Sequence, residues 1–169
     1  MPSPVGHSLA GLAVGWAVGR PARPSRALVI QVLTLAAIGV APDLDLLWGR
    51  HSYETHSIGA AVMVASVAAW RHWPVGPETR AGIFATVCLA WLIHPLLDMF
   101  SMDNNPPIGV MLWWPFSSDF VHATPFFDPI SRYWSRPETW PNNFAAAGRE
   151  LLLIAPVAFV IWLVRRGRP

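Results

Sequence analysis

The chain has 169 residues, of which 53% are hydrophobic and only 13% are charged. Soluble proteins carry roughly 25% charged residues, so this composition favours an integral membrane protein. The length fits a single domain, residues 1–169, and the lone cysteine, Cys88, excludes an intramolecular disulfide. Every basic side chain is an arginine, and the arginines occur in short clusters between apolar runs, so no nucleic-acid partner is expected.

Five apolar runs predict five helices, at residues 5–19, 27–41, 58–70, 81–100 and 151–164. A helix that crosses a bilayer needs about 20 apolar residues, and only 81–100 reaches this length comfortably. The other runs must recruit flanking residues or thin the bilayer locally. The predicted fold is therefore an all-α, polytopic membrane bundle of about five transmembrane helices. A soluble protein with buried helices is the alternative.

The arginines predict how this bundle is oriented. If all five runs cross the membrane, three arginine clusters lie on one side, which the positive-inside rule makes the cytoplasm. These clusters contain Arg20, Arg23, Arg26, Arg71, Arg80, Arg165, Arg166 and Arg168. The opposite side carries Arg50, Arg132, Arg136 and Arg149.

Histidines and carboxylates gather at the outer end of this predicted bundle. They are His7, Asp43, Asp45, His51, His56, His94 and Asp98, with Glu150 at the expected start of the last helix. Only arginines were used to set the orientation, so this convergence is an independent indication of a site. Ionisable residues at membrane depth indicate function by default.

The pair His94 and Asp98 is the centre of this prediction. Residues four apart lie on the same face of a helix, and an imidazole and a carboxylate presented together can bind a divalent metal. Pro95 lacks a backbone N–H, which predicts a bent or loosened helix beside His94. The alternative is a buried His–Asp hydrogen bond that only links helices.

Histidine and carboxylate ligands without thiolate suit zinc, with manganese or iron as alternatives. We expect Asp45, His56, His94 and Asp98 to bind one ion. His7, Asp43 and His51 either complete a second metal site or orient the ligands. A metal lowers the pKa of its bound water, and a spare carboxylate, Asp43 or Glu54, would accept the proton.

The segment 101–149 is the longest loop and is rich in proline and aromatic residues. Proline disfavours a long helix there, and aromatic rings suit the headgroup layer of a membrane. The segment is predicted to be an irregular extracytoplasmic loop. It either covers the mouth of the site as a cap or lies on the membrane surface.

A set of motifs in fixed order carries a family resemblance. It comprises Gly6-His7 with Gly11, Pro42-Asp-Leu-Asp45, His51 through Thr55-His56-Ser57, His94-xxx-Asp98, and Trp114-Pro115-Phe116. Together these motifs resemble the YdjM-like family of membrane-bound, metal-dependent hydrolases of bacterial inner membranes. The resemblance implies a small multi-pass protein of that membrane, with a His/Asp metal centre at one membrane face. In this chain Ser52 and Tyr53 stand where Arg-Gly is usual, and Tyr53 resists the positive φ that glycine permits.

More remotely, the pattern is similar to zinc-dependent phospholipase C and single-strand-specific nucleases. This similarity implies that Asp45, His56, His94 and Asp98 bind one metal, and that His7 serves a neighbouring one. The chain departs from it because it has no second His-xxx-Asp pair.

The leading functional prediction is metal-dependent hydrolysis of a phosphoester, in a phospholipid-like substrate near the headgroup layer. The alternative is a non-enzymatic membrane protein whose metal site is structural, regulatory or used for metal handling. A weaker third hypothesis, a small transporter with a proton relay, expects polar residues across the whole membrane depth.

Overall fold

A computed structural model describes the chain except for residues 103–105, 132, 134 and 167–169, so Arg132 and Arg168 lie outside the described residues. The described residues form five α-helices and three short 3-10 helices, and contain two isolated β-bridges but no strand. The α-helices are α1 (Pro4–Gly19), α2 (Arg26–Val40), α3 (Ile58–Arg71), α4 (Arg80–Met99) and α5 (Trp140–Arg166). The 3-10 helices are η1 (Ala41–Trp48), η2 (Glu54–His56) and η3 (Pro137–Thr139). The all-α prediction is confirmed.

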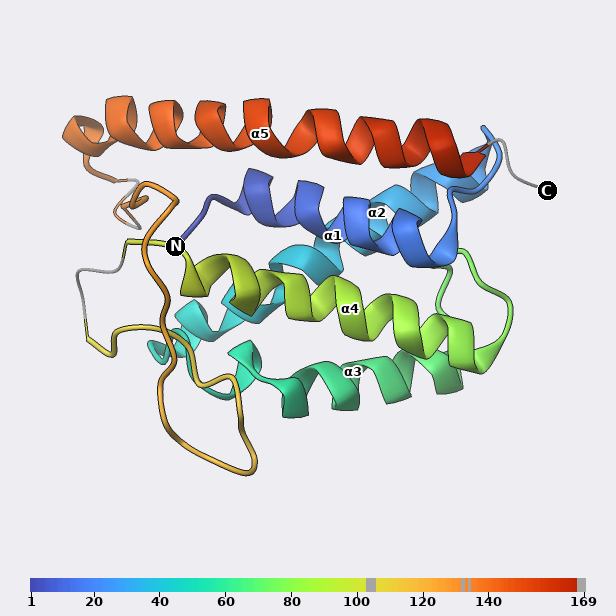
Figure 1. Cartoon of the computed structure of the whole chain (residues 1–169), viewed down its shortest axis with the longest axis horizontal. Coiled ribbons are helices and arrows are strands. Elements are labelled where there is room, and N and C mark those ends of the chain that lie inside the picture. Colours follow the sequence, from blue (N-terminus) through green and yellow to red (C-terminus); the bar gives the residue numbers. More distant parts are fainter. Residues whose placement is uncertain (103–105, 132, 134, 167–169) are drawn as a thin grey trace.

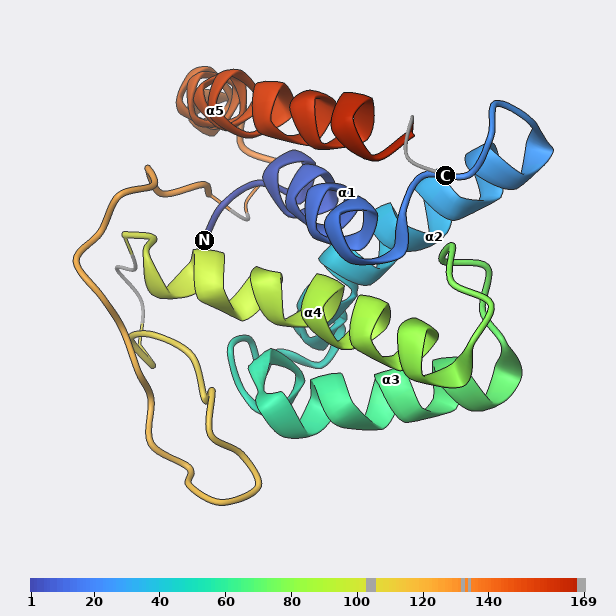
Figure 2. The ribbon, with the colours of Figure 1, turned by 45° about the vertical axis from the view of Figure 1, so that its right-hand side comes forward.

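The helices lie side by side along the long axis of the molecule, with α1 and α4 in the middle (Figure 1). Helix α1 contacts α2, α4 and α5, whereas α4 contacts α1, α2 and α3. The turned view in Figure 2 shows α5 along α1, on the opposite side of the bundle from α3. Fully buried side chains such as Leu35, Ala61, Ile83 and Val87 fill the space between α2, α3 and α4.

Small residues bring α1 close to α2. A Cβ atom on Gly11 would lie 2.9 Å from the Cα atom of Gly39, and a Cβ atom on Gly39 would meet the carbonyl of His7. Only glycine leaves room for this approach of two backbones. The contact places His7 and the C-terminal end of α2 next to the polar end of α4.

Three helices are long and apolar enough to cross a membrane: Arg26–Trp48, Arg80–Met99 and Pro137–Arg166. Helix α3 is apolar but has only 14 residues, and α1 has 16. Only 11% of the apolar stretch of α5 is buried, and Leu152, Phe159 and Val160 on this helix are exposed. An outer surface of this kind fits lipid contact.

The last helix begins at Trp140, whereas the sequence predicted a start at residue 151 after a loop over 101–149. The prediction was wrong because it followed the apolar run, and the first turns of α5 mix polar residues with small and aromatic ones. Pro141 is tolerated there because the first backbone N–H groups of a helix have no partner inside the helix. Glu150, expected at the helix start, therefore lies inside α5. Helix α4 continues through Pro95 as one element.

The arginine clusters and the candidate site lie at opposite ends of the bundle. The clusters around Arg20, Arg26, Arg71, Arg80 and Arg165 lie at one end of the bundle, where α1, α3 and α5 end and α2 and α4 begin. The candidate site lies at the other end, beside η1, η2 and the last turns of α4.

Candidate metal centre

The predicted site residues come from five separate segments that meet at one end of the bundle. Asp43 and Asp45 lie on η1, His56 ends η2, and His51 precedes η2. His94 and Asp98 lie one turn apart on α4, and His7 lies near the start of α1. Ser57 begins α3 as its N-cap, accepting the Ala60 N–H at 3.0 Å, and so fixes the end of η2.

Four ligand atoms converge in this cluster: His56 Nε2, His94 Nε2, Asp43 Oδ1 and Asp98 Oδ2. The two Nε2 atoms lie 3.2 Å apart. Each Nε2 lies close to both oxygens, His94 at 3.4 Å from Asp43 and 3.2 Å from Asp98. The corresponding distances from His56 are 3.7 and 3.3 Å. A tetrahedral zinc ion with bonds of about 2.0–2.1 Å holds its ligand atoms roughly 3.3–3.4 Å apart. The side chains thus have the spacing that a zinc ion requires.

The carboxylates of this group have histidine nitrogens near them but accept no hydrogen bond. Both oxygens of Asp43 and both oxygens of Asp98 are buried without a hydrogen bond. Leaving a charged buried group unsatisfied costs more than the roughly 1–3 kcal/mol of a neutral one. A divalent cation would satisfy these oxygens, so the residues fit a metal ion in chemistry as well as in spacing.

The imidazoles are oriented by the partners of their Nδ1 atoms. His94 Nδ1 lies 2.7 Å from the carbonyl oxygen of Gly39, which can only accept. His56 Nδ1 lies 3.0 Å from the Thr55 hydroxyl oxygen, whose hydrogen goes to Asp45, and 3.1 Å from Asp45 Oδ2, so its neighbours also accept. In their neutral form both rings therefore carry the hydrogen on Nδ1 and leave the lone pair on Nε2 for a metal. Such outer partners fix the tautomer of a metal-binding histidine.

Asp45 accepts several hydrogen bonds, whereas neither oxygen of Asp43 accepts one. Its Oδ2 atom accepts from the Thr55 hydroxyl at 2.7 Å and from the Ser52 N–H at 3.1 Å. Its Oδ1 atom lies 3.2 Å from His51 Nδ1. The sequence predicted Asp45 as a metal ligand and left Asp43 to complete a second metal site, to orient the ligands or to accept the proton. The geometry favours Asp43 as a ligand and Asp45 as an orienting residue. Asp43, Asp45, His51 and His56 also form a second, overlapping group with ligand spacing.

The surroundings of η2 favour positive charge. Burial disfavours the charged form of the His56 imidazole, but the nearby carboxylates of Asp43, Asp45 and Asp98 outweigh it and raise the pKa of His56 well above its usual value. The same surroundings favour a metal cation.

The remaining predicted residues lie in different places. His7 is fully buried, stacks on His94 with ring centroids 3.6 Å apart, and has Nε2 at 3.3 Å from Asp98 Oδ1. Glu54 points away: it pairs with Arg50 at 2.8 Å, with 41% of its side chain exposed, and belongs to neither ligand group. Glu150, which belongs to α5, is buried against the start of α1, where it accepts hydrogen bonds from the Ser3 N–H and hydroxyl.

In the loop between η1 and η2, the positive φ falls on Ser52 and not on Tyr53. Ser52 has the positive φ, 72°, and Tyr53 has an ordinary φ of −87°. The Ser52 backbone is fixed on both sides, since its N–H donates to Asp45 and its carbonyl accepts from the Met111 N–H at 2.9 Å. The substitution of Arg-Gly by Ser-Tyr is therefore accommodated without a positive φ at Tyr53.

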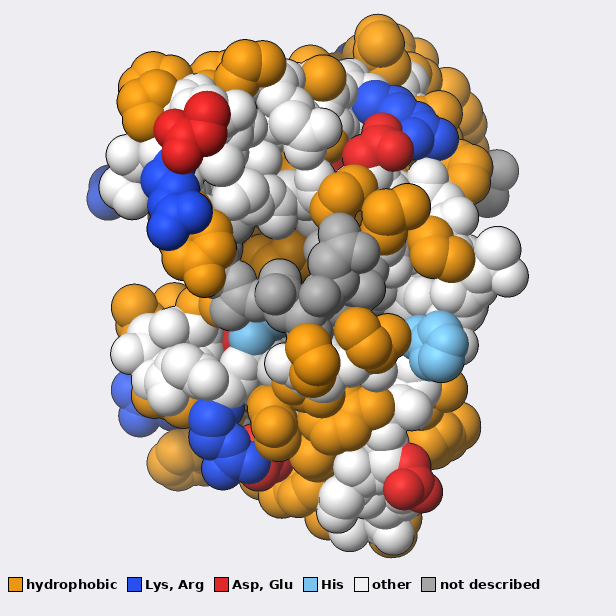
Figure 3. Space-filling view, turned by 90° about the vertical axis from the view of Figure 1, so that its left-hand side faces the viewer, with side chains coloured by type: hydrophobic (Ala, Val, Ile, Leu, Met, Phe, Trp, Pro, Cys, Tyr) orange, Lys and Arg blue, Asp and Glu red, His pale blue; other side chains and the backbone are white. Residues whose placement is uncertain are grey.

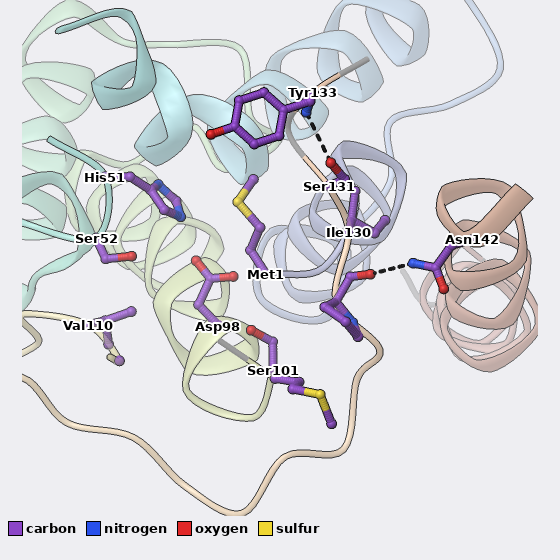
Figure 4. Close-up of a pocket in the computed structure, with 13 residues that line it drawn as sticks. Met1, His51, Ser52, Asp98, Ser101, Val110, Ile130, Ser131, Tyr133 and Asn142 are labelled. Atoms are coloured by element: carbon purple, nitrogen blue, oxygen red, sulfur yellow. Dashed lines mark hydrogen bonds between the residues drawn. The ribbon is translucent and has the colours of Figure 1, made fainter. Parts of the chain in front are cut away.

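A pocket of about 280 Å³ connects the cluster to the surface. Figure 4 shows the Asp98 carboxylate pointing into it, with His51 and Ser52 on one side and Ser131 and Asn142 on the other. Residues of the long loop form much of its wall. Figure 3 shows the end face of the molecule, where a histidine side chain is visible within a recess of the surface.

The sequence did not indicate several residues that orient the site side chains or line the pocket. Gly39 and Thr55 orient the histidine and aspartate side chains, and neither stands out by type. Asn142 lines the pocket from α5, in a stretch that the apolar pattern assigned to a loop. The sequence offers no signal for it beyond a polar residue ahead of an apolar run.

The helical bundle, its apolar outer surface and the buried His/Asp cluster at one end define a membrane protein with a candidate metal site. The chain matches the YdjM inner membrane protein family over residues 1–167, and it belongs to this family. It is accordingly an inner membrane protein, as the resemblance of its motifs implied. No curated protein and no solved structure gives a match, and the remote similarity to phospholipase C and nucleases is not shown.

Proposed function

We propose that this protein is a membrane-embedded, metal-dependent hydrolase of phosphoesters, with phospholipid-like substrates. The observation that carries the proposal is the pocket that ends on Asp98 and His51, directly beside four convergent ligand atoms. A metal site that serves only to hold helices together needs no access from outside. Here one ligand residue, Asp98, lines the pocket, while His56 and His94 do not.

The chain's own residues would divide the work as follows. Asp43, His56, His94 and Asp98 would hold the ion, and zinc suits this donor set best. A bound divalent ion supplies a lowered pKa for water and polarises the phosphoryl oxygen. Gly39 and Asp45 keep the two imidazoles in the binding tautomer. His51 lines the pocket and is oriented by Asp45, so it replaces Glu54 as the candidate proton acceptor.

The position of the pocket supports a lipid-like substrate. Exposed apolar side chains lie at the same end as the site, on η1 (Leu44, Leu47, Trp48) and on the loop (Trp113, Phe116). Aromatic and apolar groups of this kind settle at the membrane interface. A substrate whose phosphoester lies in the headgroup layer would reach the pocket without leaving the bilayer, and the loop would serve as its cap.

We further propose that all of residues 1–169 form one membrane domain with five crossing helices and an extracytoplasmic site. The arginine clusters at the opposite end support this orientation through the positive-inside rule. Helices α1 and α3 are short for a span, but both pack against α4, and local thinning of the bilayer accommodates short helices.

The test combines metal content with hydrolysis. The wild-type protein, purified in detergent without chelator, should contain near-stoichiometric zinc or manganese and should cleave phospholipid or a generic phosphodiester. The variant His51→Ala should keep its metal and lose most of its hydrolysis, and Leu152→Ala on the exposed face of α5 should change neither. A metal-loaded wild type that cleaves none of these substrates would refute the proposal.

A structural or regulatory metal site is the second candidate. It is favoured by the four convergent protein atoms, since a zinc ion that stays tetrahedral with four protein ligands has no position for water, whereas the proposed hydrolase requires a further position on the ion. Cobalt-substituted protein separates the two functions. If inorganic phosphate changes the visible spectrum of the cobalt, a position is open to substrate; a spectrum that phosphate leaves unchanged supports the structural role.

A further inference from the structure

One wall of the pocket is attached to α5 by side-chain amides. Pro129, Ile130 and Ser131 line the pocket, and they belong to the irregular loop. Asn143 accepts the Ser131 N–H at 2.8 Å and donates to the Ser131 carbonyl at 2.9 Å. Its neighbour Asn142 donates to the Pro129 carbonyl at 2.9 Å, a contact that is visible in Figure 4.

The pair of bonds between Asn143 and Ser131 is specific to an amide. A side-chain amide carries a donor and an acceptor in the geometry of a peptide group, so it can bond both backbone groups of one residue as a neighbouring strand would. Asn143 is fully buried, and its amide satisfies backbone groups that would otherwise need water. Leucine has the same size and can make neither bond.

This attachment is separate from the metal ligands. Among the described helical elements, α5 contacts α1 and η3, and the ligands lie on η1, η2 and α4. A change at Asn143 therefore reaches the wall of the pocket before it reaches the ion.

We propose that Asn143 is a positioning residue that holds the pocket wall at residues 129–131 and so sets the width of the pocket for its substrate. The part of this inference that concerns substrate rests on the proposed hydrolase function. The part that concerns the wall does not, because the position of the wall can be measured without turnover.

The first measurement is cysteine labelling. The chain has a single cysteine, so Ile130→Cys in a Cys88→Ala background places one reactive thiol in the wall. Asn143→Leu should raise its rate of labelling by a small maleimide about tenfold, because a lost buried hydrogen bond shifts an equilibrium by roughly this factor. Leu152→Ala, on the exposed face of the same helix, should leave the rate unchanged.

The second measurement separates positioning from general stability. Asn143→Leu should keep stoichiometric metal and raise KM about tenfold, with kcat within about twofold of wild type. Asn143→Asp keeps an acceptor for the Ser131 N–H and should give an intermediate KM. An unchanged or slower labelling rate, or loss of the metal in Asn143→Leu, would overturn the proposal. If wild type hydrolyses nothing, the proposed function fails while the labelling result still decides the role of Asn143.

Discussion

Two kinds of buried polar side chain at opposite ends of this bundle differ in how their hydrogen bonds are satisfied. At the arginine-rich end, the fully buried Gln31 accepts from the Ala22 N–H at 2.7 Å and donates to the carbonyls of Arg20 and Val75 at 2.7 and 3.0 Å. At the other end, Asp43 and Asp98 are buried with no hydrogen bond to either carboxylate. The chain itself satisfies Gln31, which indicates a structural role. The two carboxylates have histidine nitrogens around them at 3.2–3.7 Å and would be satisfied by a cation, which indicates a site.

The largest expected effect on metal binding comes from replacing residues at each of the two ends. Asp98→Ala takes away a ligand atom and should abolish metal binding in the purified protein, as should His94→Ala. Gln31→Leu should retain stoichiometric metal, because its partners lie at the far end of the bundle. Mass spectrometry of the bound metals measures all three variants. If the two ligand variants kept their metal, His94 and Asp98 would be a structural pair, comparable to Gln31.

The next test concerns the two aspartates of η1. Asp43→Asn should remove a ligand and lose most of the metal affinity, whereas Asp45→Asn should lower the affinity about 10–100-fold, as expected for an outer partner of a ligand. Both substitutions keep the size of the side chain. Competition with a chromophoric chelator gives the two affinities. The opposite order would restore the assignment that the sequence suggested.

The different roles of these two aspartates could not be predicted from the sequence. The arginine clusters and the apolar runs were enough to predict an all-helical bundle with His and Asp residues gathered at one end. The roles of Asp43 and Asp45 depend on which neighbours surround each carboxylate, and these come from distant segments: His94 and His56 near Asp43, Ser52 and Thr55 near Asp45. Spacing in the sequence contains no information about such neighbours.

The start of α5 was missed for a related reason. The apolar run begins at residue 151, and the helix begins eleven residues earlier with a mixture of polar, small and aromatic side chains. Asn143 and Glu150 face the protein there, bonded to Ser131 and Ser3. A helix that faces lipid along one part and binds polar backbone along another has no single pattern of hydrophobicity.

Replacing Gln31 should change the stability of the protein and leave the metal site unaffected. Gln31→Leu leaves the Ala22 N–H and two carbonyls without a partner, so it should lower the free energy of unfolding by about 1–3 kcal/mol. The loss should be the same with and without chelator, because distant sites are additive. Thermal denaturation in detergent measures it, with the exposed Leu33→Ala of the same helix as control. A loss that disappeared on metal removal would mean that the two ends are coupled.

The smallest effect should come from Trp91, which connects the buried core to the site. Its indole N–H donates to the Thr55 carbonyl at 2.8 Å, and Thr55 both precedes His56 and bonds Asp45. Trp91→Phe keeps the ring packed in the core but removes this bond, worth about 0.5–1.5 kcal/mol, so metal affinity should fall by roughly two- to tenfold. Chelator competition measures the change, and Trp70→Phe, an exposed tryptophan of α3, should change nothing. An unchanged affinity in Trp91→Phe would show that η2 is held by its bonds to Asp45 and Ser57 alone, and that the metal centre is independent of the core beneath it.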